Sequence, residues 1–112
     1  MALIDTSPAV IEVGLGEVPL VGFDATNYQT TTGDTSVTSP TVTITDISVN
    51  PPVVVPAALS GAPTVSGNVI KQRVLGSALI AGHSYYLIAT YTGQPSGNIW
   101  EMRLSIDCPA GS

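Results

Sequence analysis

Hydrophobic and polar residues alternate most regularly near the C-terminus of the chain. Five mostly apolar side chains fall on one side of an extended backbone: Trp100, Met102, Leu104, Ile106 and Cys108. The residues between them, from Glu101 to Asp107, are charged or polar. Because the side chains of a β-strand point to opposite faces in turn, this period of two predicts a half-buried antiparallel strand over residues 100–108.

Residues 83–92 form a second strong strand pattern, in which both sides of the extended chain are largely apolar or aromatic. One side carries Tyr85, Leu87, Ala89 and Tyr91, and the other carries Tyr86, Ile88 and Thr90. Two apolar faces are typical of a strand in the middle of a sheet. The intervening Gln-Pro-Ser-Gly segment, residues 94–97, predicts a turn that joins the two strands as a hairpin.

Weaker patterns occupy the middle of the chain. Residues 41–49 alternate, and a change of parity near Asp46 predicts a β-bulge. The next residues, Asn50 to Pro52, end this strand because proline cannot donate to a β-ladder. The remaining predictions are an edge strand or loop at 53–57, a weak strand at 58–65, a turn at 66–68, a strand at 69–75 and a loop at 76–82.

These short strands, with a turn about every ten residues, imply an all-β fold. No window has a helical apolar period longer than two turns. We therefore expect a small antiparallel immunoglobulin-like β-sandwich over residues 41–112.

The first forty residues lack such alternation, and we expect residues 1–40 to form an extended N-terminal arm. Two apolar pieces, residues 9–13 and 18–23, form either a short hairpin over 9–23 or part of the arm. Residues 24–40 are polar and rich in threonine, which is typical of a linker or an exposed extended chain. Threonine is β-branched, so such a chain also suits pairing with an edge strand of a neighbour.

The arm is therefore the predicted partner-binding region. The candidate contact residues are its apolar, aromatic and threonine side chains: Val10, Val13, Val18, Leu20, Phe23, Tyr28, Thr31 and Thr35.

The composition of the chain also predicts that it binds partner chains. The chain has 112 residues, and without the arm its core would be small, at about 65 residues. Its single cysteine excludes a disulfide within the chain. The chain has only one His and one Cys, so we do not expect a metal site. Charged residues make up 10% of the chain, against roughly 25% in soluble domains. Burial of the surface against partner chains is what remains to stabilise such a domain.

The charge balance excludes some partners. The net charge is -5, and the three basic residues Lys71, Arg73 and Arg103 are too few for a nucleic-acid footprint. No apolar run approaches the roughly 20 residues that cross a membrane, and residues 1–5 lack the basic region of a signal peptide. We therefore expect neither nucleic acid nor membrane as a partner, and synthesis in a bacterial-type cytoplasm.

The sequence offers little chemistry for catalysis. His83 is the only histidine, and no nucleophile-elbow motif surrounds any serine. Cys108 lies on the apolar face of its strand, where cysteine usually acts as a small hydrophobe. The eight acidic residues are dispersed and form no calcium loop. We expect no cofactor, no metal and no enzymatic activity, with His83 in a surface turn.

The aromatic residues leave one alternative open. Tyr85, Tyr86, Tyr91 and Trp100 could build a platform for carbohydrate, although their placement on strands favours packing in the core.

Residues 65–108 resemble a known family. The stretch 65–69 opens a strand, Gly76 and Gly82 bracket a short loop, and residues 82–87 look like a "G-x-x-Y-x-L" strand start. Thr92, Gly97 and Glu101 then lead into the last strand. This pattern resembles phage fibre–tail adaptor proteins, and the topology looks like that of capsid decoration, or cement, proteins.

The resemblance implies a non-enzymatic bacteriophage virion structural protein. We expect a capsid decoration protein that clamps neighbouring capsid subunits through its arm and β-domain. The alternatives are an adaptor that connects tail or fibre to the particle, and a carbohydrate- or receptor-binding β-module. The implied partners are the major capsid protein or other virion subunits and further copies of the chain, for example in a trimer. The expected location is the virion, assembled in the host cytoplasm.

Overall fold

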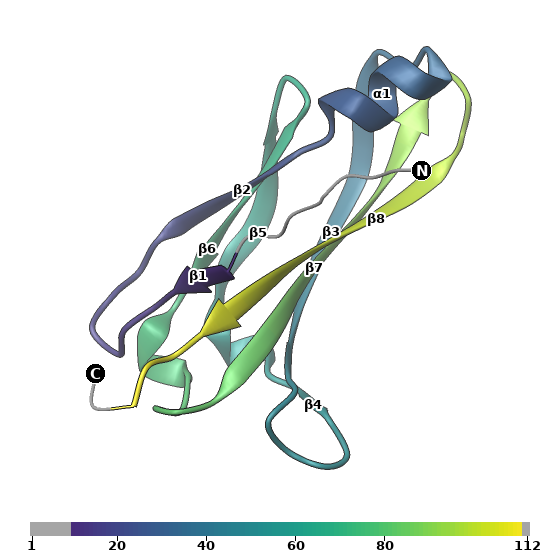
Figure 1. Ribbon diagram of the computed structural model, residues 1–112. Coiled ribbons are helices and arrows are strands. Elements are labelled where there is room, and N and C mark those ends of the chain that lie inside the picture. The colour runs from purple at the N-terminus through teal and green to yellow at the C-terminus, as the bar shows by residue number, and fades with distance from the viewer. Residues whose placement is uncertain (1–9, 111–112) are drawn as a thin grey trace.

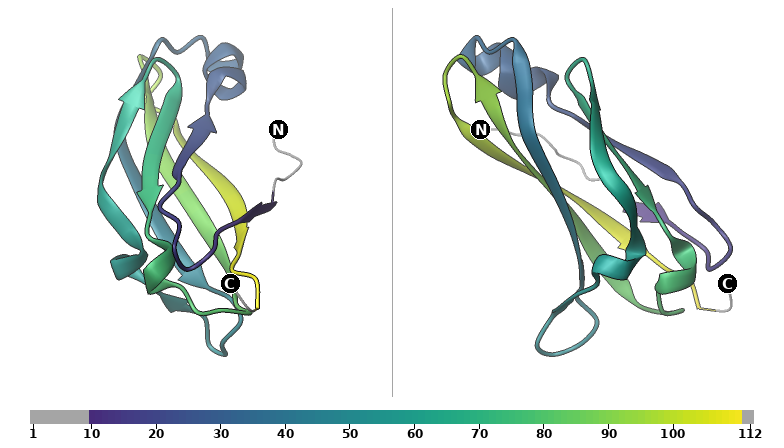
Figure 2. Two further views of the ribbon diagram at one scale, coloured as in Figure 1. Left: turned by 90° about the vertical axis from the view of Figure 1, so that its left-hand side faces the viewer. Right: turned by 180° about the vertical axis from the view of Figure 1, so that it is seen from behind.

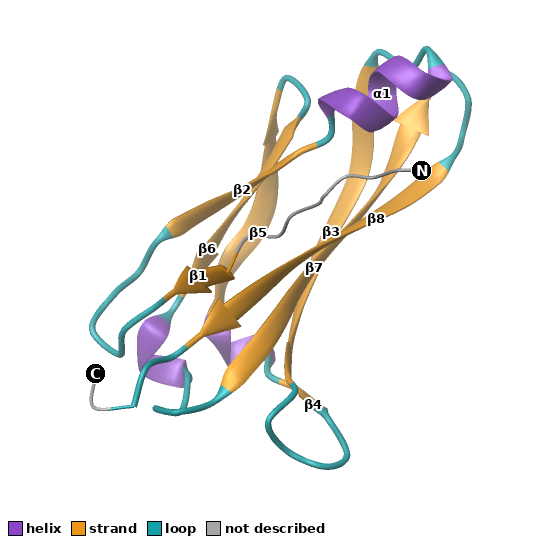
Figure 3. Cartoon of the chain, viewed as in Figure 1, coloured by secondary structure: helices purple, strands orange, loops and turns teal. Residues whose placement is uncertain are grey.

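The computed structural model describes residues 10–110, which fold as two β-sheets packed face to face (Figure 1). Sheet A contains five strands in the order β1 (Val10–Glu12), β8 (Ile99–Asp107), β7 (Ser84–Gln94), β3 (Ser36–Asp46) and β4 (Val53–Val54). Sheet B contains three, in the order β2 (Leu20–Asp24), β6 (Val69–Val74) and β5 (Leu59–Ser66). The helical elements are α1 (Thr26–Thr32) and the short 3₁₀ turns η1 (Pro56–Ala58) and η2 (Gly76–Ala78), as Figure 3 shows.

This strand order confirms the predicted immunoglobulin-like sandwich. In the seven-stranded form of such domains, one sheet is built from the third, sixth and seventh strands and the other from the first, second, fourth and fifth. With β4 left out of the count, the strands of this chain follow that division except β1, which lies beside β8 in sheet A. Here β3, β7 and β8 form the centre of sheet A, while β2, β5 and β6 form sheet B. All neighbouring strands are antiparallel except β1, which runs parallel to β8.

The core lies between the sheets and follows the predicted alternation. The inward face of β7 carries Tyr85, Leu87, Ala89 and Tyr91, all buried. Met102, Ile106 and Cys108 are buried on β8 and beyond its end. β7 is a central strand, as predicted, because it pairs with β3 on one side and with β8 on the other. Burial of these side chains supplies the main driving force for the fold.

The β-bulge predicted near Asp46 is found in β3, but at an earlier position in the strand. The register of β3 with β7 shifts between Thr38 and Thr41, whereas Asp46 keeps the inward parity of Ile44. Ser39 adopts a left-handed φ of 52°, next to Pro40, which has no N–H to donate. The parity change seen in the sequence after Asp46 marks the end of the strand instead.

Residues 10–40 correct the prediction of an extended arm, because they belong to the sandwich. β2 pairs with β6 over all five of its residues, from Leu20 to Asp24. The hairpin predicted over residues 9–23 is not formed by the described part of this range, because β1 and β2 lie in different sheets. Val21 and Phe23 point inward and are buried, so burial decides the pairing of β2. Residues 1–9 of the predicted arm lie outside the described residues.

The threonine-rich segment, predicted as a linker, instead contains α1. The carboxylate of Asp24 accepts hydrogen bonds from the backbone N–H and the hydroxyl of Thr26, which starts the helix. Gly33 ends it in the left-handed conformation, with φ of 74°. Threonine is a weak helix former, so the helix depends on tertiary contacts, chiefly through the buried side chain of Gln29.

The two ends of the sandwich differ. Figures 1 and 2 place α1 beside the β7–β8 hairpin at one end and the loop before β4 at the other. The predicted turn at 66–68, the loop at 76–82 and the strands on either side of them are formed within a few residues of the expected bounds. The edge strand expected at 53–57 is present as β4 followed by η1.

Candidate functional site

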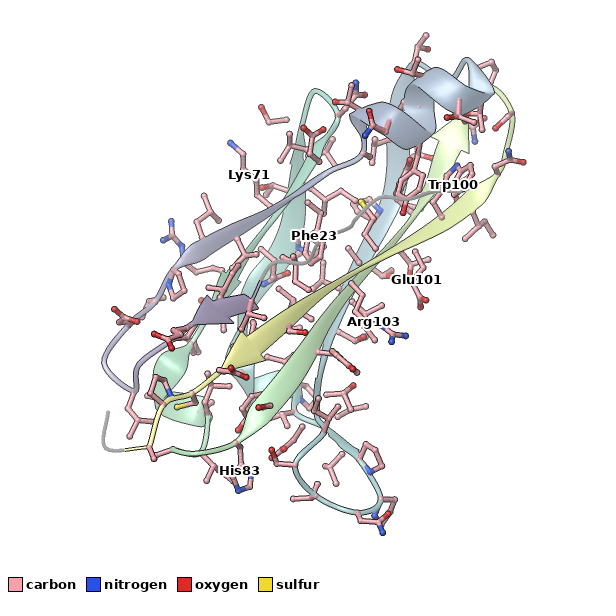
Figure 4. All side chains as sticks on the ribbon, viewed as in Figure 1. Phe23, Lys71, His83, Trp100, Glu101 and Arg103 are labelled. Atoms are coloured by element: carbon pink, nitrogen blue, oxygen red, sulfur yellow. The ribbon has the colours of Figure 1, made fainter. Side chains whose placement is uncertain are left out.

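The outward side chains of β3, β7 and β8 form a broad surface, here called the outer face of sheet A. Strand register places them in three rows: Thr41, Thr90 and Glu101; Thr43, Ile88 and Arg103; Thr45, Tyr86 and Ser105. Hydroxyl and apolar groups dominate these rows, with one acid and one base. Figure 4 shows Glu101 and Arg103 pointing away from the sandwich, whereas Phe23 lies between the sheets.

The one positive charge of this face is packed over an aromatic ring. The guanidinium carbon of Arg103 lies 4.7 Å from the centroid of the Tyr86 ring. A cation over an aromatic face is attracted by the ring quadrupole. Tyrosine and arginine are also enriched in protein interfaces. The face can therefore offer hydroxyl donors, apolar contact area and one oriented cation to a partner.

A side groove of about 330 Å³ lies along one edge of the sandwich, between β2 and β8. Its walls are Gly22, Phe23, Asp24 and Tyr28 on one side and residues 101–104 of β8 on the other. The groove exists because β1 is short. Within residues 10–110, β1 pairs only with Ser105 to Asp107, so no described strand covers the edge of β8 from Ile99 to Leu104.

Trp100 packs against Tyr28, one of the residues that line the groove. Its ring is stacked on Tyr28, with the ring centroids 4.6 Å apart and the planes 16° from parallel. The indole nitrogen Nε1 is shielded from solvent and has no hydrogen-bond partner within the described residues. Tyr85 and Tyr91 are buried, which confirms core packing for these two aromatic residues. One face of Trp100 is covered by Tyr28 and therefore cannot stack on a sugar ring.

A polar cluster surrounds His83 at the end of the sandwich opposite α1. The Nδ1 atom of His83 lies 2.7 Å from Oδ2 of Asp46, whose side chain is 5% exposed. Ser84 directs its hydroxyl to Asp107 and not to His83, and its backbone N–H donates to the hydroxyl of Ser48. These contacts tie the ends of β3, β7 and β8 together. A nucleophile within reach of the imidazole, which hydrolysis by a serine–histidine pair needs, is not among these contacts.

A small hollow beside this cluster has a volume of about 300 Å³. It is lined by residues from β1, β7, β8 and the segment after it, including Glu12, His83, Asp107 and Cys108. Within residues 10–110, no three His, Cys, Asp or Glu side chains are grouped as a metal site requires. The same residues contain no helix that is both long and apolar enough to span a bilayer.

Asp34 connects the end of α1 to the β7–β8 hairpin. Its carboxylate accepts hydrogen bonds from the backbone N–H of Ser96 at 2.8 Å and from the hydroxyls of Ser96 and Thr32, each at 2.7 Å. Burial of this group alone would raise its pKa, but the hydrogen bonds from Ser96 and Thr32 outweigh burial and lower the pKa of Asp34 below its ordinary value. These hydrogen bonds of Asp34 hold the end of α1 against the β7–β8 hairpin.

The predicted partner-binding residues do not gather on one surface. Val13 and Phe23 are buried in the core, so the prediction that they contact a partner is wrong for these two residues. Tyr28 is packed against Trp100 beside the groove. The exposed members are spread over β1, the β1–β2 loop, β2, the last turn of α1 and the segment between α1 and β3: Val10, Val18, Leu20, Thr31 and Thr35.

Two of the eight residues that line the groove, Phe23 and Tyr28, are among the predicted partner-binding residues, and the other six are not. Residues 101–104 were assigned correctly to a strand, but the groove arises from the difference in length between β8 and β1. The one local signal was Gly22, a residue without a side chain inside a strand, which often marks a close approach or a binding surface.

Comparison of the chain with protein-family models, with curated proteins and with solved structures found no significant match. What the molecule does is therefore inferred from its own residues and their geometry.

Proposed function

We propose that this protein is a non-enzymatic structural subunit of a bacteriophage particle, and that it decorates the capsid. The observation that supports this proposal most is the outer face of sheet A. It combines rows of threonine with Tyr86 and Ile88, and it carries only Glu101 and Arg103 as charged groups in its three central rows. Burial of such a face against another protein would require partners for only these two charges.

The composition adds to this support. Only 10% of the residues are charged, so a large part of the surface can be desolvated at low cost. The resemblance of residues 65–108 to phage adaptor proteins and to capsid decoration proteins directs the proposal to a virion. No part of this function needs nucleic acid, a membrane or a cofactor.

The mode of binding differs from the clamp expected from the sequence. Residues 10–40 belong to the sandwich and so cannot reach across to a neighbouring subunit as an arm. We therefore assign the contact with the capsid to the outer face of sheet A of the folded domain. Copies of the chain would lie side by side on the particle, with the major capsid protein beneath them.

The test is the chain's presence and copy number in purified particles of the phage that encodes it, measured by quantitative mass spectrometry. Trypsin is unsuitable because Lys and Arg number only three, so a protease that cleaves at Asp and Glu, eight in the chain, should be used. A decoration protein is expected at a copy number comparable to that of the major capsid protein. A few copies per particle would support the adaptor instead, and absence from washed particles would overturn both.

A further inference from the structure

Strand β8 has one open edge within residues 10–110. On one side it pairs with β7 from Ile99 to Asp107. On the other side its pairing with β1 covers only Ser105 to Asp107. The stretch from Ile99 to Leu104 has no described strand on that side, and such an edge is a template for strand addition.

The hydrogen bonds between β7 and β8 fix which backbone groups face this edge. Just beyond the end of β8, the N–H of Cys108 donates to the carbonyl of His83 at 3.0 Å. Bonded and non-bonded pairs alternate along an antiparallel ladder, so the even-numbered residues of β8 bond to β7. The odd-numbered residues Ile99, Glu101 and Arg103 therefore direct their N–H and C=O groups to the open edge.

Two other strands carry features that block strand addition, and β8 does not. The register of β3 shifts at Pro40, and β5 contains Pro63 within a register shift between Ser60 and Thr64. A proline or a bulge protects an edge, because the first removes a donor and the second twists the strand. Residues 99–104 contain no proline and keep an unbroken register with β7.

The charges on this edge are complementary to themselves. Glu101 and Arg103 are exposed and point the same way, out from the sandwich (Figure 4). If a second copy of β8 lies antiparallel with a two-fold axis at Met102, Glu101 of each copy falls opposite Arg103 of the other. An axis at Glu101 or at Arg103 would set like charges opposite each other, which is destabilising. The charges therefore select the register centred on Met102.

The apolar side chains agree with this register. On the core side Met102 would meet its counterpart, and Trp100 would lie opposite Leu104 of the second copy. The paired segment ends where β1 of the second copy begins, so that Ile99 would meet Val10 of that copy. Ile99 is 71% exposed and Val10 is 58% exposed, the two highest values among the large hydrophobic residues from 10 to 110. Contact between them would remove apolar surface from water.

We propose that this chain forms a two-fold symmetric dimer, in which residues 100–104 of β8 pair antiparallel with the same residues of a second copy. The two A sheets then become one continuous sheet. A second copy is the occupant because a two-fold contact requires a self-complementary segment, and residues 100–104 are one. This inference does not depend on the proposed function.

Charge reversal in the full chain tests the pairing, with the dimer dissociation constant measured by analytical ultracentrifugation. We expect Glu101→Arg and Arg103→Glu each to raise this constant by about tenfold or more, because two attractive cross-strand pairs become repulsive. The double variant Glu101→Arg with Arg103→Glu makes the pairs attractive again, and we expect it to dimerise like the original chain. Lys71→Glu is the matched control, because Lys71 lies on β6 in the other sheet.

The possible results are distinct. Weak single variants, a restored double variant and an unaffected control support the proposal. An original chain that stays monomeric at its highest soluble concentration would overturn it, as would single variants that dimerise normally. A double variant as weak as the single ones would overturn the register.

Disulfide trapping gives a second measurement. Glu101 and Arg103 of the two copies would form a bonded pair with Cα atoms about 5.5 Å apart, which a disulfide can bridge. We expect a mixture of the Glu101→Cys and Arg103→Cys chains to form a mixed disulfide under mild oxidation, detected by mass spectrometry. Glu101→Cys alone is the control, because its two copies would lie diagonally apart. Cys108 can stay because it is buried, and equal crosslinking in mixture and control would contradict the register.

Discussion

The hydroxyl of Tyr91 donates a hydrogen bond to Oε1 of Gln29, with 3.2 Å between the two oxygen atoms. This bond joins the central strand β7 to α1, and both side chains are buried. It explains how a threonine-rich segment with weak helix propensity stays helical, because the helix is attached to the core at Gln29 and by Asp34 to the β7–β8 hairpin.

The first prediction concerns pH. Burial raises the pKa of Tyr91 to about 12, with smaller contributions from the Asp34 carboxylate and Tyr28. A raised pKa in the folded protein means that the stabilisation is complete below the ordinary value of 10 and is lost as the pH rises from 10 toward 12. We expect alkaline unfolding in this range. A spectrophotometric phenol titration should show a late component that Tyr91→Phe reduces, and burial also raises the pKa of Tyr85. A titration of the folded chain without any component above the ordinary value would contradict this prediction.

The second prediction concerns Gly93. A Cβ atom at this position would collide with the carboxylate of Asp34 and lie 3.0 Å from Oε1 of Gln29. We expect Gly93→Ala to destabilise the fold by about 1–3 kcal/mol, as overpacking does, measured by urea unfolding. Gly16→Ala is the matched control because a Cβ there meets nothing within 4 Å. Similar stability of the two variants would show that the helix end is not packed against the hairpin.

The third prediction separates core from surface on β2. Phe23 is 3% exposed, whereas Leu20, three positions earlier on the same strand, is 50% exposed. We expect Phe23→Ala to cost about 3–5 kcal/mol of unfolding free energy and Leu20→Ala to cost little. Thermal unfolding followed by circular dichroism would compare them. Equal small effects would restore the view that residues 18–23 form an arm and not a strand of the sandwich.

The fourth prediction tests the outer face of sheet A. Thr43 is exposed in the middle of this face, and Thr64 is exposed on β5 of the other sheet. We expect Thr43→Glu to weaken binding to particles that lack the protein by about tenfold or more, because an unpaired charge would be buried in the contact. Co-sedimentation with such particles is the measurement. Thr64→Glu should bind like the original chain, and the reverse order of the two variants would move the contact to sheet B.

The local pattern of apolar and polar residues was sufficient to predict the part of the fold in which alternation along a strand matches burial in the core. In β7 and β8 every second side chain enters the core, and the two strands are neighbours in sequence and in space. The hairpin, the central position of β7 and the sandwich class could therefore be inferred. Residues 18–23 were predicted as a β-like piece, but the place of β2 in the sandwich was not, because only Val21 and Phe23 enter the core from it and Gly22 between them weakens the pattern.

The candidate site was less predictable for a physical reason. The outer face of sheet A is set by the register of three strands, and only the pairing of β7 with β8 is local. The side groove depends on where β1 ends relative to β8, which no single segment encodes.

By itself, then, the sequence determined the all-β class, the β7–β8 hairpin, the low-charge surface and the absence of a disulfide within the chain, because these follow from residue types and from a period of two. Three further features depend on tertiary contacts: residues 10–40 complete the sandwich, Thr26–Thr32 is helical, and Val13 and Phe23 lie in the core. Contacts between residues far apart in the chain outweigh the weak local preferences of threonine and glycine in these segments.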